Sequence, residues 1–189
     1  MSRTDCCSVR FGLHEYVSVQ RPIALDLTIC HPAPPFLAFY GLVQNNETLL
    51  QMAYDQCRLY RDELITDEYL WAHVRLGSWQ DEGAWATGNA WAAMGIMRVY
   101  ATIEKSSFRE SMSAQLVELG NWAAQITQQS WRYRSPITGG LYNYLGSDST
   151  SQFVDLAATA LMAAATYRVS QYGIDDSMVG FLLLPRASY

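Results

Sequence analysis

No proline interrupts the 100 residues between Pro35 and Pro136. A proline inside a helix removes a backbone hydrogen bond and clashes with the preceding turn, so this stretch is open to long helices. Apolar residues recur at helical spacing both in this stretch and after it, with glycine-rich loops between. Five helices are expected, at about 36–43, 47–64, 89–104, 108–129 and 151–172; residue 45 or 46 is expected to cap the second of them. A short strand is expected at 69–74.

The expected helices alternate in character. Those at 89–104 and 151–172 are apolar almost all round, whereas those ending near 64 and 129 are amphipathic. A helix that is apolar on every side is buried, and an amphipathic helix faces solvent on one side. Long loops precede the apolar helices. The pattern predicts an all-α fold of helical hairpins in an inner and an outer layer, as in an α/α toroid, with the loops on one rim. An ordinary helical bundle with long loops is the alternative.

Composition excludes several classes of protein. The chain is 50% hydrophobic and 16% charged, which is too apolar for a disordered chain. It has 13 Lys+Arg against 18 Asp+Glu and no basic stripe, so no nucleic-acid partner is expected. The longest charge-free apolar stretch, 156–167, is too short to span a membrane. The segment 1–16 lacks the apolar core of a secretory signal, which leaves the cellular location open.

The cysteines and tryptophans bear on the site. The cysteines Cys6, Cys7, Cys30 and Cys57 form no C-x-x-C pair or His–Cys cluster, so no metal or cofactor is expected, and Cys57 is expected to be a buried thiol. All six tryptophans lie between Trp71 and Trp131. Clustered aromatic residues suit both core packing and a groove that stacks sugar rings.

Four short stretches carry a family resemblance. They are A-P-P-F-L-A-F-Y-G at 33–41, L-W-A-H at 70–73, W-A-T-G-N-A-W-A-A-M at 85–94 and D-L-A-A-T-A at 155–160. In this order and spacing they resemble glycoside hydrolase families 88 and 105, the unsaturated uronyl hydrolases, and most of all the fungal branch of family 105-like proteins. The resemblance covers 26–172; 1–25 is an unassigned N-terminal segment and 173–189 a C-terminal tail.

The resemblance implies a fold and an activity. The family fold is a six-hairpin (α/α)6 toroid, and the likeness is to its C-terminal half, so a partial toroid is expected from a fragment, a truncated gene model or a relic. Family members hydrate the 4,5-unsaturated uronic acid at the end of oligosaccharides, such as those derived from pectin. One aspartate protonates C4 while water attacks C5, and the hemiketal then opens and releases the sugar.

The resemblance places the catalytic aspartate eight residues before the phenylalanine of the P-F-L helix. Here that position is Thr28, and the nearest carboxylate is Asp26, ten residues before Phe36. Asp26 takes the catalytic role if the loop carries an insertion. His31 and Pro32 also replace the aromatic residue and methionine of the family. A solvated or helix-capping carboxylate is the alternative role for Asp26.

The resemblance also implies contacts with the sugar. The implied substrate-binding residues are His73, Trp85, Thr87, Asn89, Trp91, Tyr142 and Asp155. Thr87 stands where the family often has arginine, so substrate preference is expected to differ, because threonine cannot hold a carboxylate bidentately. The alternative role of Asn89 is helix capping, and that of Asp155 is compensation of a helix dipole.

The histidine and the aromatic residues also suit purely structural roles. The alternative role of His73 is that of a hydrogen-bonded loop residue. For Trp85 and Trp91 the alternative is that at least one of them is a core residue. Tyr142 and Tyr144 either stack on sugar or pack against Trp131.

Three functions remain open at the level of sequence. The first is a hydrolase acting on unsaturated uronyl oligosaccharides. The second is a non-catalytic remnant that keeps part of the sugar groove. The third is a helical interaction module whose exposed aromatic residues meet a partner chain, with a homodimer completing the two layers.

Overall fold

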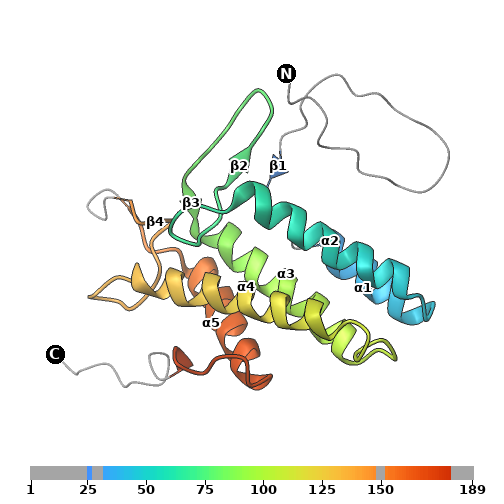
Figure 1. Ribbon diagram of the computed structural model, residues 1–189. Coiled ribbons are helices and arrows are strands. Elements are labelled where there is room, and N and C mark those ends of the chain that lie inside the picture. Colours follow the sequence, from blue (N-terminus) through green and yellow to red (C-terminus); the bar gives the residue numbers. More distant parts are fainter. Residues whose placement is uncertain (1–24, 27–31, 148–151, 180–189) are drawn as a thin grey trace.

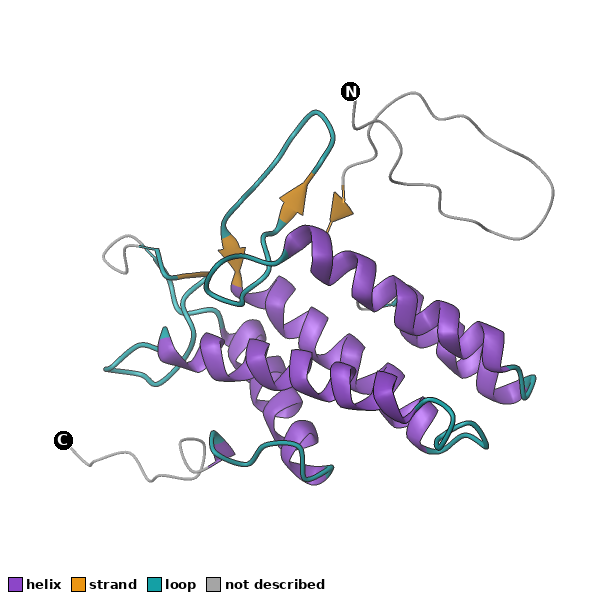
Figure 2. Cartoon of the chain, viewed as in Figure 1, coloured by secondary structure: helices purple, strands orange, loops and turns teal. Residues whose placement is uncertain are grey.

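The computed structural model describes residues 25–26, 32–147 and 152–179. Its helices are α1 (Ala33–Val43), α2 (Glu47–Leu64), α3 (Ala86–Glu104), α4 (Ser113–Arg132) and α5 (Leu156–Gln171). Its strands are β1 (Leu25–Asp26), β2 (Val74–Arg75), β3 (Ala84–Trp85) and β4 (Tyr144–Leu145). Helices dominate the described residues, and the strands are short pieces at one end of the helices (Figures 1 and 2).

The helices form two layers. Helix α3 packs against both α1 and α5, and these three form the inner layer. Helices α2 and α4 are the outer partners of α1 and α3, joined to them by short turns (Figure 1). Helix α3 buries residues on all its faces, whereas α2 is amphipathic. The expected partial toroid with inner and outer helices is therefore confirmed.

Local signals explain where the helices begin. Pro34 and Pro35 occupy the first turn of α1, where a missing N–H costs nothing. The side chain of Asn46 caps α2 by accepting a hydrogen bond from the Leu49 N–H at 3.3 Å. Asp155 caps α5 in the same way, through the Ala158 N–H at 2.9 Å.

The structure corrects several expected boundaries. Helix α3 begins at Ala86, three residues earlier than expected, and α4 begins at Ser113, five residues later, because turns occupy 106–112. The strand expected over 69–74 is reduced to β2. Tyr69 has a φ of 61°, which interrupts an extended strand, and Trp71 forms only an isolated bridge to Ile65.

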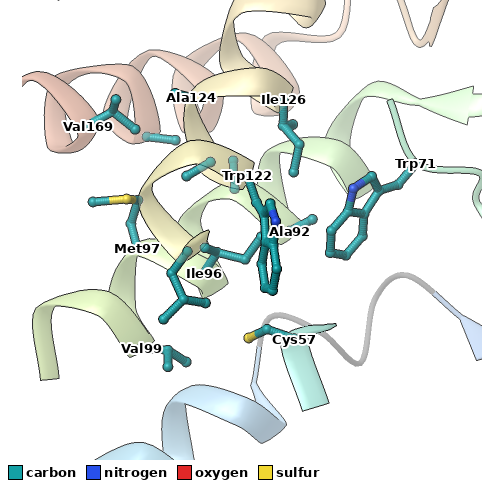
Figure 3. Close-up of a cluster of buried hydrophobic side chains, with 14 of the residues drawn as sticks. Cys57, Trp71, Ala92, Ile96, Met97, Val99, Trp122, Ala124, Ile126 and Val169 are labelled. Carbon is teal, nitrogen blue, oxygen red and sulfur yellow. The ribbon is translucent and has the colours of Figure 1, made fainter. Parts of the chain in front are cut away.

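The core lies between the two layers. Figure 3 shows Cys57, Trp71, Ile96 and Trp122 among the buried side chains of this core. The Cys57 side chain is fully buried, which confirms the expected buried thiol. Trp131 is also buried and donates its indole N–H to the Thr166 hydroxyl at 2.8 Å. Three of the six tryptophans are thus core residues.

The short strands gather at the end where the inner helices begin (Figure 1). Strand β1 pairs antiparallel with β2, and β3 pairs antiparallel with β4. The expected rim of long loops therefore exists, and the N-termini of α1, α3 and α5 meet there. No helix in the described part of the chain is long and apolar enough to cross a membrane.

Candidate functional site

A hairpin on the rim carries the first two residues of the site, His73 and Asp81. Its two sides pair through reciprocal backbone hydrogen bonds between Val74 and Asp81, both 2.9 Å long. Its turn begins at Leu76 and Gly77, which have φ values of 62° and 84°. The closed hairpin brings one carboxylate oxygen of Asp81 within 2.9 Å of Nδ1 of His73.

Asp81 is the centre of a hydrogen-bond network. Its Oδ2 atom contacts His73 and also accepts a hydrogen bond from the Tyr144 hydroxyl at 2.6 Å. Its Oδ1 atom accepts the Gly83 N–H at 2.9 Å. A methyl group on Gly83 would lie 2.7 Å from the Tyr144 ring, so only glycine lets that ring approach. The network ties the loop before α3 to β4.

The network shifts two ionisation equilibria. Burial alone would raise the pKa of Asp81, but hydrogen bonds from Tyr144, His73 and Gly83 outweigh it and hold that pKa below its ordinary value. Burial, the hydrogen bond to Asp81 and the charge of that carboxylate raise the pKa of Tyr144 to about 12. At neutral pH the pair is therefore a carboxylate and a neutral phenol, and Asp81 is not a proton donor.

Four aromatic rings line this part of the rim. The ring of His73 lies 4.7 Å from that of Trp85 and 5.9 Å from that of Trp79, measured between centroids. Trp85 meets Trp91 edge to face at 5.5 Å and donates its indole N–H to Asn143. Trp79 is 62% exposed, whereas the other rings are partly buried. These rings form the aromatic wall, defined as Trp79, His73, Trp85 and Trp91.

Thr87 and Asp155 join the N-termini of two inner helices. The Thr87 hydroxyl donates to Oδ2 of Asp155 at 2.7 Å, and Oδ1 of Asp155 caps α5. Asp155 thus lies at the N-terminus of α5 as its cap residue. Both carboxylate oxygens already have protein partners, so this pair braces the rim.

Asn89 lies beneath the rim, with 0% of its surface exposed. Its side chain accepts a hydrogen bond from the Trp71 N–H at 2.8 Å and donates to the carbonyls of Trp71 and Trp85 at 2.9 and 3.0 Å. It is not the cap of α3, because the cap position is Trp85. In this structure the Asn89 side chain faces the backbone of Trp71 and Trp85 and has no surface open to solvent.

The remaining expected residues lie nearby. Asp26 sits in β1 directly opposite Val74, the residue that follows His73. Tyr142 is half-buried before α5, where its backbone pairs with Val154. Thr28 and His31 lie outside the described residues.

Sequence reasoning missed Asp81, Trp79 and Asn143, and it named Tyr144 only as a stacking or packing residue. One signal was present: an Asp-Glu-Gly run between His73 and the W-x-x-G-N-x-W motif. Among the described residues, no group of three His, Cys, Asp or Glu side chains could hold a metal ion. A surface hollow of about 460 Å³ lies at the opposite end of α3, beside Tyr100 and Glu104, and contains none of the site residues.

The architecture matches solved structures. A glycoside hydrolase of family 105 from C. acetobutylicum superposes with a TM-score of 0.71 at 13% identity, over 84% of this chain and 46% of that one. A possible family 105 member from Klebsiella pneumoniae gives 0.72 at 16% identity, over 84% and 41%. Unsaturated glucuronyl hydrolase from Bacillus sp. GL1, responsible for glycosaminoglycan degradation, gives 0.62 at 13% identity, over 87% and 41%.

The chain has the fold of a partial six-hairpin glycosidase toroid. It spans less than half the length of each of these three structures. At such low identity the likeness establishes the fold alone, because one fold hosts many activities. No protein-family model matches the sequence. No curated protein matches it either.

Proposed function

We propose that this protein is a glycoside hydrolase-like protein whose rim binds oligosaccharides ending in a 4,5-unsaturated uronic acid, such as those derived from pectin. The observation that carries the proposal is the aromatic wall with its hydrogen-bonded histidine, which lies where the inner helices of a glycosidase fold begin. The order of the four sequence motifs supports assigning the chain to the C-terminal half of the ring and to the fungal branch of families 88 and 105.

In this proposal the rim residues divide into two groups. His73, Trp85, Trp91 and Tyr142 contact the sugar, because aromatic faces stack on sugar rings and half-buried side chains remain accessible to it. Thr87, Asn89 and Asp155 act from below by holding the helix ends in place. The positive dipole ends of α1 and α3, which carry no acidic residue in their first turns, supply attraction for the uronate in place of the arginine that Thr87 replaces.

Asp26 is proposed as the acid and base of the reaction. It protonates C4 of the unsaturated ring, and its carboxylate then takes a proton from the water that attacks C5. Asp26 is the carboxylate-bearing residue that β1 places beside the histidine hairpin.

The test is loss of the ultraviolet absorbance of the C4=C5 bond when the chain is mixed with unsaturated oligogalacturonides. Removing a general acid typically costs 10²- to 10⁴-fold in rate, so D26N is expected to lose at least about 100-fold. D67N is the matched control, because Asp67 is an exposed carboxylate in the α2–β2 loop. Full activity of D26N contradicts the assignment of Asp26. A well-folded chain with no turnover supports the non-catalytic remnant instead.

A second candidate function, self-association, follows from two exposed faces. Helix α1 exposes the large side chains Phe36, Phe39, Tyr40 and Val43. Helix α5 exposes the small residues Ala157, Ala160 and Ala164, with the larger Leu156 and Tyr167 near its two ends. The two helices are the outermost members of the inner layer. Two copies related by a two-fold axis through the ring would set the large residues of one α1 against the small residues of the other α5, giving six inner helices.

Sedimentation velocity over a range of concentrations tests this homodimer. The wild-type chain is expected to dimerise, and F39E to remain monomeric because it would bury an unpaired charge. V117E is the matched control: Val117 is 63% exposed and Phe39 60%, but Val117 lies on outer helix α4. A wild-type chain that stays monomeric at every concentration, or equal dissociation by both variants, contradicts the homodimer.

A further inference from the structure

Asp81 lies beside the proposed sugar site but has no role in the proposed reaction. Its two oxygens accept three hydrogen bonds, from the Gly83 N–H, the Tyr144 hydroxyl and the His73 ring. An ionised carboxylate has no proton to give, so each of its partners must be the donor. The Gly83 N–H can only donate, and the Tyr144 hydroxyl can rotate to donate.

This one-sided requirement decides the state of His73. A neutral imidazole carries its proton on one of two nitrogens, and the hydrogen bond of one nitrogen sets the state of the other. Since Nδ1 lies 2.9 Å from Oδ2 of Asp81, Nδ1 must carry the proton. The Nε2 atom then holds a lone pair. Among the described residues Nε2 has no hydrogen-bond partner, and the side chain keeps 17% of its surface exposed.

We propose that Asp81 is a positioning residue that locks His73 in the Nδ1–H form, so that Nε2 accepts a hydrogen bond from a ligand hydroxyl. The inference rests on the proposed function for its ligand class, a sugar hydroxyl. In this form His73 binds hydroxyl groups, which can donate a hydrogen bond to Nε2. It does not bind the carboxylate of a uronate, because the Nε2 lone pair repels the carboxylate oxygens. The rings of Trp79 and Trp85 lie 5.9 and 4.7 Å from that of His73 and restrict its rotation.

The variant D81N separates this role from simple packing. Asparagine has the same shape but replaces one oxygen with an NH₂ group. That group cannot face the Gly83 N–H, because two donors would meet and the backbone cannot turn. It must therefore face His73 and Tyr144. His73 can satisfy the NH₂ group only as an acceptor at Nδ1, which moves its proton to Nε2.

The experiment is a long-range ¹H–¹⁵N correlation spectrum of the full chain labelled with ¹⁵N-histidine, recorded at about pH 9, above the usual range of histidine titration. The chain has three histidines, so H73Q identifies the signals of His73. The wild-type spectrum is expected to show a protonated Nδ1 and a bare Nε2. D81N is expected to show the reverse pattern.

Y144F is the matched control, since it removes a donor to the same oxygen and leaves the carboxylate in place. It is expected to keep the wild-type pattern. A proton on Nε2 of the wild-type protein, or an unchanged pattern in folded D81N, overturns the inference. If D81N fails to fold, the wild-type and Y144F spectra still decide it. The measurement needs no turnover, so an inactive chain with the expected tautomers would refute the hydrolase proposal and not this one.

Discussion

Asn89 provides a test of how the rim is attached to the core. The bridge between Ile65 and Trp71 is closed by backbone bonds of the neighbouring residues, so the N–H and C=O of Trp71 point away from that partner. The Asn89 amide hydrogen-bonds to both groups: it accepts from the Trp71 N–H at 2.8 Å and donates to the Trp71 C=O at 2.9 Å. It lies where a third strand would otherwise pair with Trp71. The substitution N89A leaves both Trp71 groups buried and unpaired.

The expected cost follows from those two groups. Each buried, unpaired polar group costs about 1–3 kcal/mol, so N89A should lower the free energy of unfolding by about 2–6 kcal/mol. In a domain of this size each kcal/mol lowers Tm by about 2–4 °C, which gives a loss of about 8–16 °C for a central value of about 4 kcal/mol.

Urea unfolding followed by circular dichroism measures this cost, and avoids signals from the nearby tryptophans. N121A is the control, because Asn121 is exposed on α4 and its loss should change the free energy of unfolding by no more than about 0.5 kcal/mol. A loss below about 1 kcal/mol in N89A would refute the reasoning, because it would mean that water or a backbone shift satisfies Trp71.

Two further predictions concern the Asp81 network. In G83A the new methyl group would lie 2.7 and 2.8 Å from carbons of the Tyr144 ring, so the ring should shift. The pKa of Tyr144 should then fall from about 12 towards its usual value of about 10, which ultraviolet titration of the phenol measures. An unchanged titration would count against the close contact. The pKa of Asp81 is lower in the folded protein than in the unfolded chain, so its stabilising effect is present above about pH 4 and is lost as pH falls through the lowered value. Urea unfolding at about pH 5 and pH 3 should therefore show a smaller loss of stability in D81N than in the wild-type chain, and equal losses would contradict the assigned hydrogen bonds.

The sequence predicts those parts of the fold that depend on neighbours along the chain. The cap at Asn46 and the prolines in the first turn of α1 are local signals, and the structure has both. The buried position of Cys57 follows from the helical spacing of apolar residues. The alternation of apolar and amphipathic helices predicts the two layers, because burial of each face depends only on its own pattern.

The site depends on residues that are distant in sequence, which explains what was missed. Asn89 forms its hydrogen bonds with the backbone of Trp71, which lies 18 residues away in the sequence, and Tyr144 donates a hydrogen bond to Asp81, which lies 63 residues away. No local spacing rule reports such partners. The three outer tryptophans also could not be separated from the three core ones, because an indole ring suits both places and its position depends on how the loops pack.

The rim cross-links have a consequence for the order of folding. Trp85 with Asn143, Asp81 with Tyr144 and Thr87 with Asp155 are pairs 58, 63 and 68 residues apart, and each joins the segment before or at the start of α3 to the segment before α5. Closing such long loops costs entropy that only the docking of α5 repays. A nascent chain that ends after α4 therefore carries Trp85, Asp81 and Thr87 without the partners that join them to the segment before α5. The complete rim, and with it the proposed binding of a sugar, should therefore form only when the last inner helix is in place.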